Sequence, residues 1–310
     1  MLSIVGGERK EYKMNKVKKF FYSQQAAPYV FVLPFVLTVL LFWIFPIGNG
    51  VLLSFQDVLK DKWVGLKNYD RLLSDKIFLK AVWNSVKYMI GTCALLIPFP
   101  LLFASLLNSK LMKKPGFFKS IYFLPALTSV VVAGTIFRLI FGEMDTALAN
   151  RVIEFFGHSP IKWLKGQWTG YFALLLVACW RWTGVNILYF LAGLQSISTD
   201  LYEAASIDGA SKWQQFKKIS FPLVKPTTVY VLTISIYAGL SMFLESYMLW
   251  KGNNSPQNIG LTIVGYLYRQ GIEKRAMGYA CAVGLVLLIV VMIVNLIQLT
   301  VTGTFKKEER

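Results

Sequence analysis

The sequence EAASIDGASKWQQFKKISFP, residues Glu203–Pro222, decides the class of protein to which this chain belongs. It is polar and basic, and it lies between two apolar runs. Each run is long enough to cross a lipid bilayer, which takes about 20 residues of helix. A basic segment between two such runs predicts a loop at the surface of a membrane protein rather than part of a soluble core.

Working outward from this loop, six apolar runs meet the length of a membrane span, and we predict that each forms a transmembrane helix. The prolines inside them would weaken soluble helices, but neighbouring helices in a membrane can satisfy the freed backbone groups. The sequence therefore predicts an all-α membrane protein. The predicted spans are 29–54, 81–107, 119–142, 169–194, 226–250 and 276–302.

Charge predicts how these spans are oriented. The chain has 310 residues, of which 55% are hydrophobic, and a net charge of +17. Basic residues exceed acidic ones in an N-terminal arm at 1–28, in the loops at 108–119 and 199–225, and in a C-terminal tail at 303–310. Because basic loops remain on the cytoplasmic side, both termini and the 199–225 loop are predicted to be cytoplasmic.

Residues suited to chemistry are few. The cysteines Cys93, Cys179 and Cys281 fall inside apolar runs without the spacing of metal ligands, and the single histidine, His158, has no neighbouring ligands. The sequence also lacks the G-x-x-x-x-G-K-[ST] phosphate loop of ATPases. We therefore expect no catalytic residue, no metal and no cofactor in this chain, and no enzymatic activity of its own.

The EAA loop, defined here as residues 199–225, is predicted to form two short helices. Thr199 or Asp200 can cap the first helix, because a side-chain oxygen accepts hydrogen bonds from free backbone N–H groups. Gly209 follows as a turn, which suits a residue of positive φ. The second helix is predicted at about Ala210–Ile219. A plain helix in the bilayer interface is the alternative that the pattern leaves open.

At these residues the chain resembles a known family. The pattern resembles the EAA signature of binding-protein-dependent ABC importer permeases, with EAA at 203–205, Gly209, Ile219 and the dipeptide Phe221-Pro222. VGLKNY at Val64–Tyr69 and LAGLQSI at Leu191–Ile197 are similar to the carbohydrate-uptake branch, the maltose-transporter type. The resemblance extends over nearly the whole chain, and it identifies 29–302 as the six-helix permease domain.

The resemblance implies a multi-pass permease subunit in a bacterial cell (inner, cytoplasmic) membrane, which forms half of the path of an ATP-driven sugar or oligosaccharide importer. It implies four kinds of partner. They are a second permease, nonidentical or alternatively a second copy of this chain, two copies of a cytoplasmic ABC ATPase that binds ATP and Mg²⁺, an extracytoplasmic solute-binding protein, and the carbohydrate itself. No nucleic acid is expected. An importer of a non-sugar solute such as a polyol phosphate is the alternative, and a stand-alone membrane enzyme or channel is a third.

The resemblance also implies that the EAA loop couples the permease to the ATPase. Glu203 is expected to dock on the ATPase by polar contact, and Ala204 and Ala205 are expected to allow close approach. Asp208 and Gly209 are expected to form the turn. The aromatic residues Trp213 and Phe216 are expected to anchor the loop to the permease or the bilayer. The predicted coupling residues are Glu203, Ala204, Ala205, Asp208, Gly209, Trp213, Phe216 and Pro222.

A sugar path needs aromatic faces and polar groups that face a cavity, because polar groups facing lipid are costly. Glu245 is the only acidic residue well inside a predicted span, and an ion pair with Arg181 or Arg138 is its alternative role. Trp180 has the alternative of an interfacial anchor. The path candidates are Trp180, Arg181, Thr183, Asn186, Glu245, Tyr247 and Tyr279.

Overall fold

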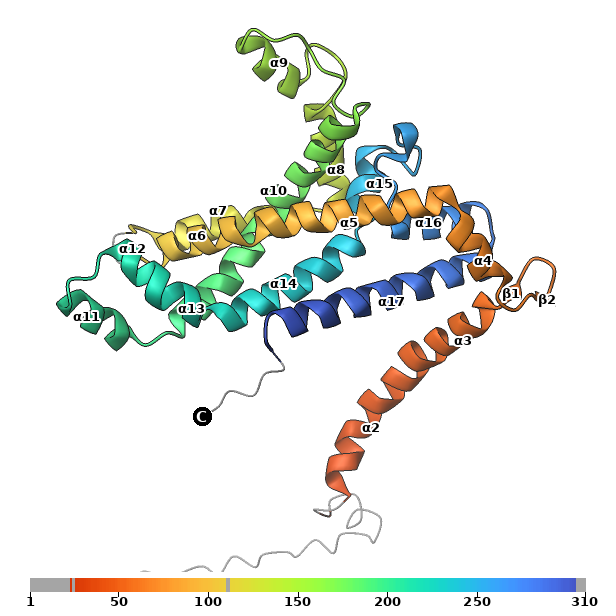
Figure 1. Ribbon diagram of the computed structural model, residues 1–310, viewed down its shortest axis with the longest axis horizontal. Coiled ribbons are helices and arrows are strands. Elements are labelled where there is room, and N and C mark those ends of the chain that lie inside the picture. Colours follow the sequence, from red (N-terminus) through yellow and green to blue (C-terminus); the bar gives the residue numbers. More distant parts are fainter. Residues whose placement is uncertain (1–22, 24–25, 110–111, 305–310) are drawn as a thin grey trace, which may run out of the picture. The chain divides into compact units, whose positions relative to one another are not determined.

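The computed structural model of the chain describes residues 23, 26–109 and 112–304 (Figure 1). This part of the chain is predominantly helical, and its only β-structure is a hairpin of β1 (Gln56–Asp57) and β2 (Lys62–Trp63). The predicted helical class is confirmed apart from that hairpin. Most of the predicted arm at 1–28, and residues 305–310 of the predicted tail, lie outside the described residues.

The chain divides into two compact units, Met1–Leu52 and Leu53–Arg310, which are considered separately. The described part of the first unit is one apolar helical segment with a π-helical turn that ends two residues before Pro46. Because proline has no backbone N–H to donate, a wider turn at this point lets the helix continue past it. The elements of the segment are α2 (Ala27–Val39), η1 (Leu40–Ile44) and α3 (Phe45–Ser54), which runs into the second unit.

The second unit holds the remaining helices in chain order. After the hairpin come α4 (Lys67–Ser74), α5 (Lys76–Leu96), α6 (Pro98–Leu107), α7 (Pro115–Leu127), α8 (Val130–Ile140), α9 (Leu148–Phe155) and α10 (Gln167–Gln195). The EAA loop contributes α11 (Thr199–Ile207), α12 (Lys212–Gln215), η2 (Phe216–Ser220) and α13 (Phe221–Leu223). Last are α14 (Lys225–Leu240), α15 (Leu244–Leu249), η3 (Pro256–Asn258), α16 (Ile263–Tyr268), η4 (Arg269–Glu273) and α17 (Met277–Val301).

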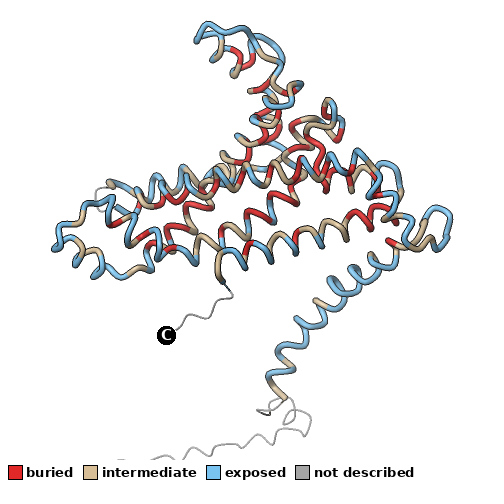
Figure 2. The backbone as a smooth tube through the Cα atoms, in the orientation of Figure 1, coloured by how far each residue is buried: buried red, intermediate tan, exposed pale blue. Residues whose placement is uncertain are grey.

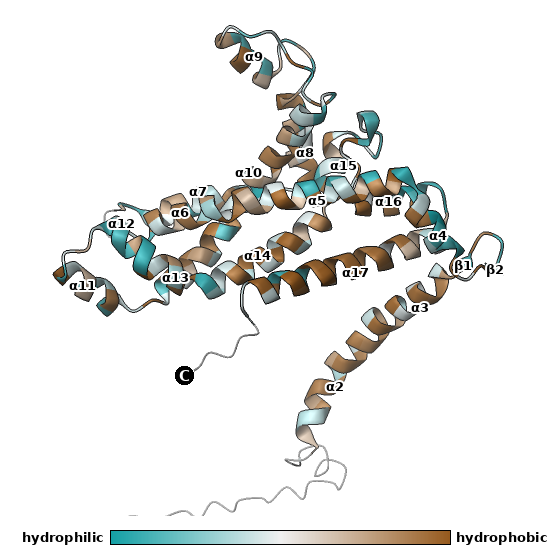
Figure 3. Cartoon of the chain, viewed as in Figure 1, coloured by the Kyte–Doolittle hydropathy of each residue, from teal (hydrophilic) through white to brown (hydrophobic). Residues whose placement is uncertain are grey.

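Four helical segments are long and apolar enough to cross a membrane, and they match the first, second, fourth and sixth predicted spans. Figure 3 shows their apolar character most plainly along α17, whereas α4 and parts of the EAA loop are hydrophilic. The described residues hold up to six spans if two bent helix pairs each count as one, namely Pro115–Leu127 with Val130–Ile140 and Lys212–Leu223 with Lys225–Leu240. The four segments are Ala27–Ser54, Lys76–Leu107, Gln167–Gln195 and Met277–Val301.

The predicted span 119–142 is not a continuous helix. It is bent by 94° between α7 and α8, where Thr128 and Ser129 have extended backbone. Pro125 lies one turn before the break and cannot donate a backbone hydrogen bond. The sequence carried this signal, but a run of apolar residues does not reveal how sharply a helix bends.

The predicted span 226–250 is interrupted as well. Its helix α14 ends at Leu240, and α15 starts at Leu244. Within the gap, the buried hydroxyl of Thr262 donates a hydrogen bond to the carbonyl of Met242 at 2.7 Å. A side chain 20 residues away thus supplies the hydrogen bond to a backbone carbonyl that would be paired within a continuous helix.

The core of the second unit lies where α5, α10, α14 and α17 face one another, and Figure 2 shows the buried residues on these helices. Gly184 of α10 packs against the backbone of Tyr122 in α7, and Gly239 of α14 packs against Met89 in α5. A Cβ atom at either glycine would overlap its neighbour. Small residues at these crossings therefore set how closely the helices approach.

Candidate functional site

The first helix of the EAA loop is capped by a different residue from those expected. The side chain of Ser198 accepts a hydrogen bond from the backbone N–H of Asp200 at 3.3 Å. Thr199 is already the first residue of α11, so the prediction of Thr199 or Asp200 as the cap is wrong by one or two positions. Ser198 has the same capping chemistry, and only the backbone path decides which of these neighbouring side chains is used.

Gly209 forms the turn between the two helices with φ of +77°. The N–H of Ala210 donates to the carbonyl of Ala205 at 2.9 Å, and the N–H of Gly209 donates to that of Ser206 at 3.2 Å. This pair of bonds is the Schellman motif, which satisfies the last carbonyls of a helix and needs a left-handed residue at the position of Gly209. The turn is therefore fixed by backbone hydrogen bonds.

A buried glutamine that sequence reasoning missed joins the two helices. Gln215 is 4% exposed, and its Nε2 donates to Ser206 Oγ at 2.8 Å and to the carbonyl of Ala210 at 3.2 Å. A second link joins Tyr202 Oη and Ser220 Oγ at 2.9 Å. No local pattern singles out Gln215, because its partners lie in the preceding helix and turn.

Most of the predicted coupling residues are exposed. Trp213 stacks on Phe216 with ring centroids 5.6 Å apart, but Trp213 is 66% exposed whereas Phe216 packs against the core beside α10 and α14. Phe216 thus holds the loop against the core, and anchoring of Trp213 in the bilayer stays a prediction. Ile207, which we did not predict, is 87% exposed at the end of α11. The exposed members of the predicted set are Glu203, Ala204, Asp208, Gly209, Trp213 and Pro222, and the partly buried ones are Ala205 and Phe216.

Substituting Gln215→Leu is expected to loosen the EAA loop without removing any exposed group. The change leaves the Ala210 carbonyl and the Ser206 hydroxyl without their buried donor, which costs about 1–3 kcal/mol. Hydrogen exchange of the amides at 203–222 should then quicken, and ATP-driven uptake should fall. Lys217→Gln, which alters an exposed residue two positions along, is the control. Unchanged exchange in the Gln215 variant would contradict the role assigned to the amide.

Among the path candidates, the structure brings Arg181 and Glu245 together. Arg181 Nη1 lies 3.5 Å from Glu245 Oε1, and each side chain is 12% exposed. The guanidinium also lies 5.3 Å from the ring centroid of Trp182, and its Nε has no partner among the described residues. Arg138, the other predicted partner of Glu245, instead donates to the carbonyl of Met248 at 3.4 Å. The pair ties α10 to α15, directly beyond the interruption at 241–243.

The other candidates are not gathered around this pair. Asn186 is buried, and its amide donates to the carbonyl of Leu96 at 2.8 Å, which holds α10 to α5. Tyr247 packs in an aromatic cluster with Phe243 and Tyr268. Trp180 packs on the ring of Phe137 at 5.4 Å and is 37% exposed, and Thr183 is half-buried. Tyr279 lies in a separate hydrogen-bond network.

That network joins four helices, and no pattern in the sequence predicts it. The Asp75 carboxylate caps α5 and accepts hydrogen bonds from Tyr266 Oη at 2.6 Å and Tyr279 Oη at 3.5 Å. Arg71 of α4 lies 4.5 Å from the ring centroid of Tyr279. Partial burial raises the pKa of Asp75. This rise is outweighed by the hydrogen bond from Tyr266, by the hydrogen bonds from the following backbone N–H groups and by the charge of Arg71. The pKa is therefore below its ordinary value of 3.8.

Acid is expected to remove the contribution of Asp75 to stability. Because the folded pKa is below 3.8, the contribution is complete above that pH and is lost as the pH falls through the lower, folded value. Asp75→Asn should therefore unfold at a lower temperature than wild type near neutral pH, and the gap should close in strong acid. The unfolding temperatures of both proteins are measured in detergent from neutral pH to strong acid. Asp70→Asn, at an exposed position of α4, is the control. A difference in unfolding temperature that does not change with pH would contradict the role assigned to the Asp75 carboxylate.

The sequence matches the family model of the binding-protein-dependent transport system inner membrane component over residues 17–303. It is 53% identical over 298 residues to the arabinooligosaccharides transport system permease protein AraP of Bacillus subtilis, covering 96% of this chain and 95% of that protein. It is 45% identical to the AraP protein of Halalkalibacterium halodurans, covering 96% of this chain and 94% of that protein.

The fold is similar to that of a solved membrane protein. A chain in the crystal structure of a bacterial ABC transporter involved in the import of the acidic polysaccharide alginate has a TM-score of 0.82 to this one. The alignment covers 94% of this chain and 100% of that chain, at 22% identity. A second crystal structure, of the alginate transporter in complex with alginate pentasaccharide-bound periplasmic protein, has a TM-score of 0.81, with 91% and 95% of the chains covered. At this identity the likeness concerns the fold.

Proposed function

The chain belongs to the family of binding-protein-dependent transport system inner membrane components, and from this premise we propose that it is the permease subunit of a saccharide importer. The observation that carries the proposal is the preformed EAA loop, with its Schellman turn and mostly exposed coupling residues. The 53% identity to a permease named for arabinooligosaccharides supports a short oligosaccharide as the substrate. The chain is a transport subunit rather than an enzyme.

The arrangement within the second unit supports an orientation. The EAA loop lies at one end of α10 and α14, whereas α4, α15 and α16 lie toward the other (Figure 1). We place the EAA loop and both termini in the cytoplasm. We count α7 with α8 as the third span and α14 with α15 as the fifth, and so retain six spans in a bacterial inner membrane. A second permease completes the path, two copies of an ABC ATPase bind below, and a solute-binding protein delivers the saccharide from outside.

We place the substrate path beside the interruption of the fifth span. A broken helix exposes backbone groups that membranes tolerate only where protein or a water-filled cavity covers them. The Arg181–Glu245 pair lies next to this interruption and keeps its two charges out of lipid. Asn186 and Tyr279, which have structural partners elsewhere, are assigned to helix packing rather than to substrate.

The proposal is tested by purifying the tagged chain from its native membrane in mild detergent and identifying what accompanies it. We expect a second permease and a soluble ATPase, and we expect the complex, reconstituted with its binding protein, to take up an arabinotriose when ATP is supplied. A chain that purifies without any ATPase would overturn the reading as an importer subunit. A complete importer that ignores arabinotriose but carries a polyol phosphate would overturn only the substrate.

A further inference from the structure

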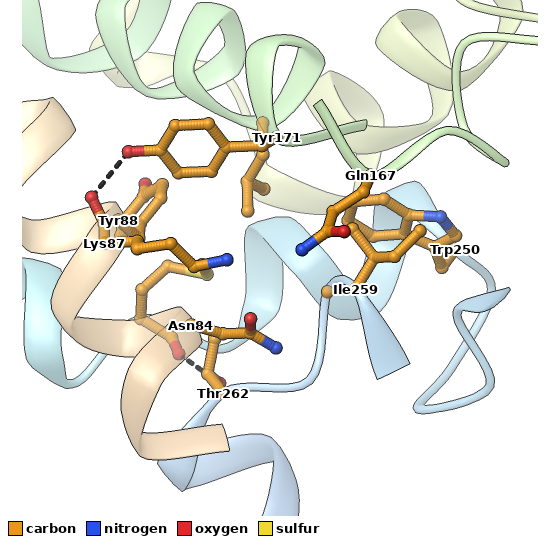
Figure 4. Close-up of a pocket in the computed structure, with 11 residues that line it drawn as sticks. Asn84, Lys87, Tyr88, Gln167, Tyr171, Trp250, Ile259 and Thr262 are labelled. Atoms are coloured by element: carbon orange, nitrogen blue, oxygen red, sulfur yellow. Dashed lines mark hydrogen bonds between the residues drawn. The ribbon is translucent and has the colours of Figure 1, made fainter. Parts of the chain in front are cut away.

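A pocket with an unpaired lysine lies between α5, α10 and the segment that follows α15 (Figure 4). The amine of Lys87 points into it, beside Asn84 and toward Gln167 on the opposite wall. The lining is polar and aromatic, and none of the described lining residues has a carboxylate. The residues are Asn84, Lys87, Tyr88, Gln167, Tyr171, Leu174, Met242, Trp250, Ile259, Gly260 and Thr262.

Lys87 is placed deep for a cation. It lies eleven residues beyond the start of the span Lys76–Leu107, which is about 16 Å along the helix axis. This 32-residue span is about 48 Å long at 1.5 Å per residue, whereas the hydrocarbon core of a bilayer is about 30 Å thick. If the span is centred in the bilayer, Lys87 lies inside the hydrocarbon region. Cations at this depth are rare, and they pair with a partner or mark a pathway.

The described residues supply no counter-charge to this amine. The ion pairs among them join other residues, namely Lys60 with Asp57, Lys165 with Glu143, and Arg181 with Glu245. The charge that acts on Lys87 is that of another cation, Lys80, seven residues earlier on the same helix. A half-buried positive charge without a carboxylate leaves the pocket attractive to an anion.

The neighbouring groups favour hydrogen-bond acceptors as ligands. The Asn84 amide already donates to the carbonyls of Asn258 and Leu261, at 2.8 and 3.0 Å, so it holds the pocket wall in place. The Tyr171 hydroxyl donates to the carbonyl of Lys87 at 2.5 Å and fixes α10 against α5. The Lys87 amine and the amide of Gln167, at the exposed rim, remain to donate to a ligand. The pocket opens at the Gln167 rim, and its volume of about 10 Å³ is close to the lower limit for a single water-sized species.

We propose that this pocket is an anion site, in which the Lys87 amine and the Gln167 amide hold a single negatively charged atom. The chemistry is shared by two sources, a free halide and one carboxylate oxygen of an acidic saccharide. A saccharide must come through the importer, so this second source rests on the proposed function, whereas the halide does not. The pocket includes Met242 of the interruption at 241–243, so the site lies beside the proposed substrate path.

The test uses the purified importer complex and follows its thermal unfolding while sodium chloride replaces sodium sulfate at constant ionic strength. Sulfate is excluded from protein surfaces and stabilises proteins in general, so the effect of the site is the difference in chloride response between wild type and the Lys87 variant. We expect chloride to raise the unfolding temperature in a saturable way. In Lys87→Gln the chloride concentration at half effect should rise by about tenfold or more, as loss of a charge-assisted hydrogen bond predicts. Lys76→Gln, at an exposed cation of the same helix, should respond like wild type.

Further arms identify the source and guard against misfolding. If galacturonate stabilises wild type more than chloride does, and galactose has no effect, the ligand is an acidic saccharide. If only chloride acts, the ligand is a free anion. Gln167→Leu removes a rim donor without removing charge and should weaken the chloride effect even if the Lys87 variant does not assemble.

Two results would overturn the anion site. They are no chloride dependence in wild type, and a chloride dependence in the Gln167 variant, and in the Lys87 variant where it assembles, that equals that of wild type. The unfolding measurements do not depend on transport. A complex that carries no saccharide would therefore contradict the proposed function, whereas the chloride dependence of unfolding decides the anion site.

Discussion

Replacing Gly209 with valine is expected to abolish ATP-driven uptake while the chain remains in the membrane. Gly209 has φ of +77°, a region that β-branched residues enter only with strain of about 1–2 kcal/mol or more. A Cβ atom there would meet nothing within 4 Å, so the effect comes from the backbone and not from a clash. The valine variant must give up the Schellman bonds of Ala210 and Gly209, and the angle between α11 and α12 changes with them.

A matched substitution separates this backbone effect from any loss of contact. Asparagine adopts the left-handed region more readily than other non-glycine residues, so Gly209→Asn should retain much of the uptake that Gly209→Val loses. ATP-driven uptake in proteoliposomes and the amount of co-purified ATPase are the two measurements. If the valine variant transports normally, or if asparagine and valine are equally harmful, the turn is not what couples the loop to the ATPase.

Breaking the Arg181–Glu245 pair is expected to have the second large effect. Both side chains are 12% exposed, so Glu245→Gln leaves a largely buried guanidinium without its counter-charge. Removing one partner of a buried pair costs about 3–5 kcal/mol. We expect the single variants Glu245→Gln and Arg181→Gln to be less stable than wild type and to lose most uptake.

The double variant distinguishes packing from transport. With Arg181→Gln and Glu245→Gln combined, no charge is left unpaired, so the unfolding temperature should recover toward wild type. Because we place the pair beside the substrate path, uptake should stay low after stability recovers. Recovery of both stability and uptake would reduce the pair to a structural link. The exposed pair Lys165–Glu143 is the control, since removing an exposed pair costs less than about 1 kcal/mol.

Local patterns in the sequence were sufficient to predict the apolar segments and the position of the turn in the EAA loop. A helix long enough to cross a bilayer is recorded in one continuous stretch, as at 169–194, where α10 runs from Gln167 to Gln195. Gly209 could likewise be identified alone, because only the conformation of that one residue is at issue. The helix cap was missed by one position because Ser198 and Thr199 have equivalent side-chain chemistry.

The sequence by itself thus determined that this is a helical membrane permease of the importer family, because hydropathy, charge and the EAA pattern act over short stretches. Only the tertiary structure decided which partner each polar group takes. It selected Arg181 over Arg138 for Glu245, joined Gln215 to Ser206, and directed Tyr279 to Asp75. It also left Lys87 facing a pocket without a carboxylate. The physical reason is that a polar group in an apolar environment must find its partner in three dimensions, and packing brings that partner from a distant part of the chain.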